Sequence, residues 1–197
     1  MPSPARSGLA PGFLVAAPAL GDPNFAGSLV LMAEHHGEGA LGFVVNRAAP
    51  IAVADVLGSV DADLRRAARE AGRDGGNVLV GGPVTPERLW VLYRPGLVAV
   101  EEGGIAVGAG LALGGSRELL ESIVRAREGG PFLLLLGYAG WAPMQVEQEV
   151  AAGAWVPLEL QDDLVFDVPL EQRWEVAVRR LGLEPGGFLV GGGGAQA

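Results

Sequence analysis

Two short apolar runs joined by a Gly-rich connector constrain the fold of this chain more than any other stretch of its sequence. Residues 28–33 (SLVLMA) and 40–45 (ALGFVV) are aliphatic and bounded by turn residues, which predicts two strands. Neither run alternates apolar with polar residues, a pattern typical of strands buried on both faces. The connector HHGEG has the length of a hairpin loop, so we predict an antiparallel hairpin in the middle of a sheet.

Antiparallel pairing sorts the polar residues of this hairpin into two groups. Six residues of strand at about 3.3 Å each separate these groups by roughly 20 Å, too far for one small-molecule site to use both. One group lies at the tip and consists of Glu34, His35, His36 and Glu38. The other brings an acid, two amides and a guanidinium together, and we favour it as the candidate ligand site: Asp22, Asn24, Asn46 and Arg47.

The charge balance disfavours nucleic acid and membrane partners. The formal net charge is -9, and all 14 basic side chains are arginine. An acidic surface without lysine is a poor match for phosphate backbones or anionic lipids, so we expect no direct nucleic-acid contact. A hydrophobic content of 49% in 197 residues predicts one folded domain with a substantial core.

Missing residue types exclude several kinds of chemistry. Without cysteine the chain has no disulfide, thiolate nucleophile or cysteine metal site, and without lysine it has no Schiff base or P-loop lysine. The two histidines, His35 and His36, are adjacent and would point to opposite faces of a strand, which disfavours a two-histidine metal site. We therefore predict no metal and no cofactor.

Two apolar segments imitate targeting or membrane sequences. The run LAPGFLVAAPAL resembles a secretory signal, but Pro11 and Gly12 interrupt it and cleavage would remove a predicted strand. Residues 129–146 carry no charge, yet they contain two prolines and four glycines, so we interpret them as a buried strand followed by a loop. We expect a soluble, cytoplasmic protein.

The remaining elements alternate between strands and helices. We expect a flexible tail at residues 1–10, a single domain at 11–190 and a flexible Gly-rich tail at 191–197. Ser116 is the predicted N-cap of a helix with an inner stripe of Leu119, Leu120, Ile123 and Val124. The other expected elements are strands at 13–17, 78–80, 89–93, 97–100 and 132–136, and helices at 51–57, 61–71, 143–152 and from an Asp167 N-cap to Gly182; residues 103–115 stay unassigned.

A second candidate region lies where the strand at 132–136 meets a glycine loop and a helix start. Backbone N–H groups and the helix dipole would favour an anion there, and Trp141 could stack on a planar ligand. We therefore add Gly82, Tyr138, Trp141 and Gln145 to the candidate site. The alternatives are structural: an Asp22–Arg47 ion pair, a turn at Gly82, and aromatic rings that close the core.

The blocks APALGDPNFAGSLVLMAEHHGEGALGFVVNR, VGGPVTPERLWVLY and LGYAGWAPMQVEQEVAAGAW together resemble the AlgH/YqgE family, a widespread bacterial family of unassigned biochemical function. The resemblance spans roughly residues 12–183. It implies an α/β (α+β type) domain whose bifurcated mixed sheet forms a pseudo-barrel flanked by helices, with no established catalytic residues. The chain departs from the family pattern at Ala48 (usually Pro), Tyr93 (His), His36 (Asn or acidic) and Met144 (Gly).

Three functions follow, in order of preference. The first is a non-enzymatic regulatory or interaction protein with a protein partner, and the second binds a small, nucleotide-like anionic ligand. The third is a hydrolase that uses Glu34, His35 or Asp22. The sequence leaves monomer and homodimer open, although exposed strand edges would permit a dimer.

Overall fold

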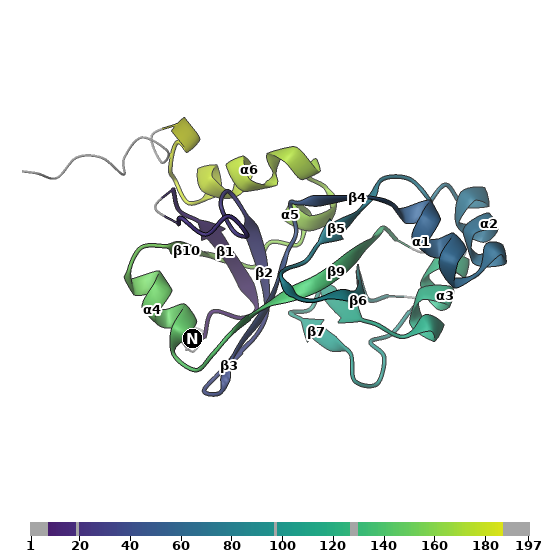
Figure 1. The fold of residues 1–197 in the computed structure, drawn as a ribbon, viewed down its shortest axis with the longest axis horizontal. Helices are drawn as coiled ribbons and strands as arrows, with labels where there is room; N and C mark the ends of the chain where they lie inside the picture. Colours follow the sequence, from purple (N-terminus) through teal and green to yellow (C-terminus); the bar gives the residue numbers. More distant parts are fainter. Residues whose placement is uncertain (1–7, 19, 97, 127–129, 187–197) are drawn as a thin grey trace, which may run out of the picture. The chain divides into compact units, whose positions relative to one another are not determined.

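The computed structural model describes residues 8–18, 20–96, 98–126 and 130–186. The chain divides into two compact units, Met1–Asn46 with Ala139–Ala197 and Arg47–Tyr138 (Figure 1). Most of the predicted tails, residues 1–7 and 191–197, lies outside the described residues. Each unit is taken in turn.

The first unit is built on an antiparallel sheet in the order β10-β1-β2-β3-β9. The predicted hairpin is confirmed, with Val30 paired to Val44 and His36 to Gly39 across the turn. A register shift between Met32 and Glu34 marks a bulge near the tip. The strands are β1(Gly12–Ala16), β2(Leu29–His36), β3(Gly39–Val44), β9(Phe132–Trp141), of which residues 139–141 belong here, and β10(Trp155–Glu159).

Helices cover this sheet because its central strands are apolar on both faces. Alternate residues of β1 and β2, among them Leu14, Val30 and Met32, pack with Val146 and Trp155 in one buried cluster. Figure 1 shows α4(Gln145–Ala151) and α6(Arg173–Arg180) on different sides of these strands. Two short segments precede α6, namely α5(Asp163–Phe166) and the 3-10 turn η1(Leu170–Gln172).

The second unit contains a mixed sheet in the order β7-β8-β6-β9-β5-β4, in which β5 runs parallel to β9. Its helices pack on one face over a core that includes Leu57, Leu64, Leu120 and Leu134. The strands are β4(Ala48–Ala52), β5(Asn77–Val80), β6(Val84–Tyr93), β7(Ile105–Val107) and β8(Leu111–Gly114), and the helices α1(Val53–Val60), α2(Ala62–Glu70) and α3(Arg117–Arg125).

The mixed α+β fold class is confirmed, and so is the branching of the sheet. β9 pairs with β3 through residues 139–141 and with both β5 and β6 through its earlier residues. The predicted pseudo-barrel is wrong, because the strand order among the described residues is an open path with a side branch and never closes.

Two helices follow their local signals closely. Asp61 is the N-cap of α2, and Ser116 is the N-cap of α3, where its Oγ accepts the N–H of Leu119 at 3.0 Å. The inner stripe predicted for α3 is buried. These elements could be predicted because a capping side chain and a 3.6-residue apolar period are both local features of the sequence.

Other elements differ from their predictions. The expected hairpin between 89–93 and 97–100 is wrong, because β6 pairs with β8, and the unassigned residues 103–115 supply the β7–β8 hairpin. Ile51 lies in β4 rather than in a helix, and Asp167 ends α5 instead of capping α6. β10 and α5 were not predicted.

Within the uncharged stretch, residues 132–141 form β9, which continues through Gly137 as far as Trp141. Among the described residues, no helix has the length and apolar character needed to cross a membrane.

Candidate functional site

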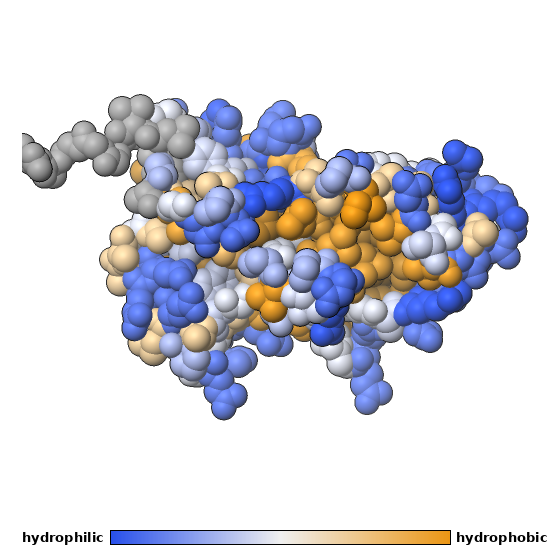
Figure 2. Space-filling model, in the orientation of Figure 1, coloured by the Kyte–Doolittle hydropathy of each residue, from blue (hydrophilic) through white to orange (hydrophobic). Residues whose placement is uncertain are grey.

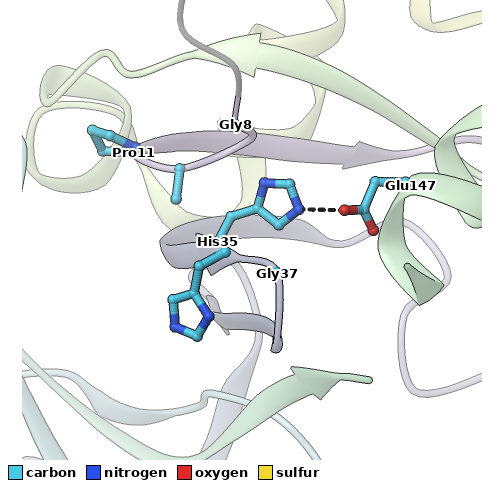
Figure 3. A pocket seen from close by; sticks show the side chains of 7 residues that line it. Gly8, Pro11, His35, Gly37 and Glu147 are labelled. Atoms are coloured by element: carbon cyan, nitrogen blue, oxygen red, sulfur yellow. Dashed lines mark hydrogen bonds and ion pairs between the residues drawn. The ribbon is translucent and has the colours of Figure 1, made fainter. Parts of the chain in front are cut away.

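A hollow of about 520 Å³ opens in the first unit beside the end of β2. Three of its side chains can bond polar groups, and they come from two elements far apart in the sequence (Figure 3). The hollow is lined by Gly8, Ala10, Pro11, His35, His36, Gly37 and Glu147.

β2 positions the two histidines differently because successive strand residues face opposite ways. The side chain of His35 is 9% exposed, whereas that of His36 is 60% exposed and lies 3.9 Å from Glu34. The predicted opposite orientation of the imidazoles is therefore confirmed, and only His35 is held in place by neighbours on both sides.

Both ring nitrogens of His35 are engaged. Nδ1 accepts the backbone N–H of Leu9 at 2.9 Å, so the proton of the neutral ring lies on Nε2. Nε2 donates to Oε1 of Glu147 at 2.8 Å, the interaction drawn as a dashed line in Figure 3. These two contacts fix both the tautomer and the orientation of the imidazole.

Glu147 belongs to the first turn of α4. Hydrogen bonds from its own backbone N–H and from His35 hold the pKa of its carboxyl below the ordinary value, although partial burial opposes this. Its second oxygen, Oε2, is buried without a hydrogen-bond partner among the described residues. The hollow therefore contains one ionised carboxylate next to a neutral imidazole.

This arrangement is a poor general base. A histidine base needs an unshared nitrogen lone pair facing the substrate, and here the Leu9 N–H occupies it. The structure also pairs His35 with Glu147 rather than with Glu34, so the Glu34–His35 dyad of the hydrolase hypothesis does not form. No group of three metal-ligating side chains occurs within the described part of the chain.

The predicted ligand residues of the first unit take part in local bonding. Asp22 accepts the N–H of Asn24 through Oδ1 at 2.8 Å and so shapes its own turn. Asn46 ties this loop to β2, since its Oδ1 accepts the Leu29 N–H at 2.8 Å and its Nδ2 donates to the Gly27 carbonyl at 2.9 Å. These contacts are local to the loop and to β2, and the alternative of an Asp22–Arg47 ion pair stays a prediction.

Trp141 fills space inside the first unit. It is 6% exposed, its ring stacks on Phe25 at 6.1 Å between centroids, and it meets Trp155 edge-on at 6.2 Å. In the sheet Trp141 pairs with Ala40, which lies opposite His35 rather than at the Asn46 end of the hairpin.

The secondary structure predicted for the anion-binding region at residues 137–145, a glycine loop followed by a helix start, is wrong. Residues 137–141 are strand, and the following helix has only seven residues and begins after Met144. Gln145 is engaged locally at the start of the helix, because its Oε1 accepts the Ala142 N–H at 3.0 Å and its Nε2 donates to Glu149 at 2.9 Å.

Three predicted site residues belong to the second unit. The carbonyl of Arg47 accepts the Val80 N–H at 2.8 Å, and Tyr138 meets Trp90 edge-on at 6.5 Å. Gly82 has a φ of 156°, which a side chain rarely adopts. Ligand binding by the eight candidate residues stays a prediction.

Sequence reasoning missed the importance of two carboxylates on α4. The first is Glu147, which accepts from His35. Glu149 accepts the indole N–H of both Trp141 and Trp155 through Oε2, each at 2.9 Å. The available signal was the presence of two carboxylates, two residues apart, on one short helix. The indole and imidazole groups that donate to them come from other elements, so the sequence did not connect them.

Comparisons with known proteins agree on one family. The AlgH-like family model matches residues 13–186. A UPF0301 protein of Anaeromyxobacter sp. strain Fw109-5 is 80% identical over the full length of both chains. A UPF0301 protein of Cupriavidus metallidurans is 36% identical over 87% of each chain.

Solved structures give the same result for the fold. The solution structure of the AlgH protein from Pseudomonas aeruginosa superimposes with a TM-score of 0.73 at 31% identity and covers all of both chains. The crystal structure of protein DIP2367 from Corynebacterium diphtheriae shares the fold, with a TM-score of 0.71 at 21% identity. The match covers 92% of this chain and 90% of that one. The chain therefore belongs to the AlgH-like (UPF0301) family, whose biochemical function is uncharacterised.

Proposed function

We propose that this chain is a non-enzymatic regulatory or interaction protein of the bacterial cytoplasm, which acts by binding a protein partner. The bonding of His35 carries the proposal: the Leu9 N–H and Glu147 take both ring nitrogens, so the histidine in the hollow serves as a fixed structural group. A net charge of -9 without lysine argues against direct DNA contact as the regulatory mechanism.

The surface of the second unit supports a protein partner. Figure 2 shows apolar residues gathered on this face in the area where Figure 1 draws β4, β5 and β9 beside α1. Ile51 of β4 is 38% exposed, and Val56, Leu89 and Leu136 are only partly buried over the core of this unit. Continuous exposed apolar surface of this kind is typical of protein-binding sites.

The test compares two matched apolar-to-charged substitutions. Ile51→Glu places a charge on this surface, and Leu183→Glu does the same at an equally exposed (38%) leucine of the first unit. Partners are crosslinked in the native bacterium at the natural expression level, identified by mass spectrometry and reconstituted from purified components. Native mass spectrometry then gives the stoichiometry, and calorimetry gives the affinity.

We expect a complex of fixed stoichiometry whose affinity falls at least about tenfold in Ile51→Glu and stays within about twofold in Leu183→Glu. If purified partners never reconstitute a stoichiometric complex, the interaction proposal is wrong. Equal losses in both variants would mean that the apolar surface of the second unit is not the binding site.

A further inference from the structure

The lining of the hollow beside His35 has one formal charge among its described residues, and that charge is negative. Gly8, Ala10, Pro11 and Gly37 contribute only backbone and small uncharged groups. None of the described residues that line the hollow is an arginine, so this part of the lining offers an anionic ligand no charged partner. Glu34, outside the lining, adds negative charge 3.9 Å from His36.

The negative charge is held in place by its surroundings. Nδ1 of His35 accepts the Leu9 N–H, and Nε2 bonds to Glu147, where this contact and the backbone N–H of Glu147 hold the pKa of the carboxyl below its ordinary value. The side chain of Glu147 is 34% exposed, although its Oε2 is itself buried and lacks a hydrogen-bond partner among the described residues. A donor group brought into the hollow would therefore gain a charge-assisted hydrogen bond.

We propose that this hollow is a binding site for a small organic cation with a primary ammonium group, which bonds to the carboxylate of Glu147. A volume of about 520 Å³ suits a molecule of the size of a short diamine or an amino-acid amide. The neutral His35 sets the position of the carboxylate, and the small lining residues leave space for the aliphatic part of the ligand. This inference concerns a site separate from the apolar surface of the second unit.

Gly37 makes the hollow experimentally accessible. A β-carbon added at Gly37 would meet no atom within 4 Å, and the backbone there is not left-handed, so a larger side chain is tolerated and would project at the wall of the hollow. Gly21 has the same two properties but does not line the hollow. Gly37→Leu and Gly21→Leu thus form a matched pair.

The experiment measures binding of putrescine to the full-length chain by isothermal titration calorimetry and by amide chemical shifts. The neutral analogue 1,4-butanediol has nearly the same length and tests whether the ammonium is required, and acetate tests the opposite charge. Glu147→Gln removes the charge while its carbonyl can still accept from His35. Glu184→Gln removes an exposed carboxylate elsewhere in the first unit as the control for net charge.

We expect one saturable putrescine site, with shifts at residues around His35 and no binding of the diol or acetate. Glu147→Gln and Gly37→Leu should each weaken binding at least about tenfold, as expected when a charged hydrogen-bond partner or the space for the ligand is lost. Glu184→Gln and Gly21→Leu should stay within about twofold.

Absence of saturable binding in the wild type would overturn the inference, as would unchanged affinity in Glu147→Gln. Equal weakening by Glu184→Gln would show that putrescine responds to net charge alone, and binding of acetate would show that the sign of the site is wrong. Because none of these variants touches Ile51, they leave the test of the protein partner unaffected.

Discussion

Gly81 lies so close to Gly137 that it has no room for a β-carbon, and Gly137 is closed in the same way by the carbonyl oxygen of Gly82. A β-carbon on Gly81 would overlap the carbonyl oxygen of Gly137, and the N–H of Gly81 donates to the adjacent Leu136 carbonyl at 2.8 Å. The parallel pairing of β5 with β9 therefore ends at a point where both strands are followed or interrupted by a glycine, which has no side chain. Gly137, which the sequence analysis placed in a loop, has this steric role.

Replacing Gly137 by alanine should destabilise the protein by about 3 kcal/mol or more. Gly137 has a φ of 71°, where an L-residue costs about 1–2 kcal/mol, and the added carbon would also lie 2.9 Å from the Val84 carbonyl oxygen. Urea unfolding monitored by tryptophan fluorescence gives the change in unfolding free energy.

Gly153→Ala is the control that separates the two effects. Gly153 has a similar φ of 76°, but a β-carbon there would meet no atom within 4 Å. We expect a loss of about 1–2 kcal/mol, the conformational part alone. If the two variants lost the same free energy, the close approach at Gly137 would contribute nothing.

Met144→Gly should stabilise the chain by about 0.5–1 kcal/mol. Met144 has a φ of 64° at the N-cap of α4, a conformation that favours glycine, and the residue is 59% exposed. Thermal unfolding measures the gain. Met144→Ala, which keeps the β-carbon, should remain within about 0.5 kcal/mol of the wild type; an equal gain in that variant would assign the effect to the exposed side chain instead.

Local signals explain how far the sequence could predict this fold. The β2–β3 hairpin and the Ser116 cap of α3 depend on residues within a few positions of each other. β9 could not be predicted at full length, because Gly137 and Gly140 resemble a loop until β3 and β6 provide hydrogen-bond partners. Likewise, the turn signal at Pro95 favoured a local hairpin, whereas β6 pairs with β8 beyond it.

The candidate site was harder to predict for the same reason. His35 and Glu147 are 112 positions apart, and no spacing rule connects the end of a hairpin to the first turn of a short helix. The sequence correctly predicted that the two adjacent histidines diverge, since strand alternation is local. It could not predict that Leu9, from the expected tail, would occupy the second ring nitrogen.

Arg173→Met should cost about 2–4 kcal/mol. Arg173 is 5% exposed, and its guanidinium donates to the carbonyls of Val45 at 2.5 Å and Val168 at 3.1 Å, both of which would lose their donor. Burial lowers the pKa of Arg173 to about 10, so it stays charged at neutral pH. Chemical denaturation tests this, with the exposed Arg179→Met as control, expected within about 0.5 kcal/mol. Similar losses in both would contradict a role for the buried guanidinium.

Asp163→Asn should reveal a stabilising ion pair that disappears in acid. Hydrogen bonds from Arg180, at 2.8 Å and 2.5 Å, are the main reason why the pKa of Asp163 lies below its ordinary value of 3.8. The native state therefore binds fewer protons than the unfolded state, and the stabilisation is complete above pH 3.8 and lost as the pH falls through the lowered pKa.

At pH 7 we expect Asp163→Asn to lose about 1 kcal/mol of unfolding free energy, a modest value because the carboxylate is 48% exposed. Urea titrations between pH 7 and pH 2 should show the two proteins converging at the acidic end. Glu175→Gln breaks the more exposed pair with Arg179 and should change stability by less than about 0.5 kcal/mol at every pH. A difference between wild type and Asp163→Asn that did not shrink as the pH fell would mean that the asparagine disturbs packing, since protonation of the aspartate removes the ion pair.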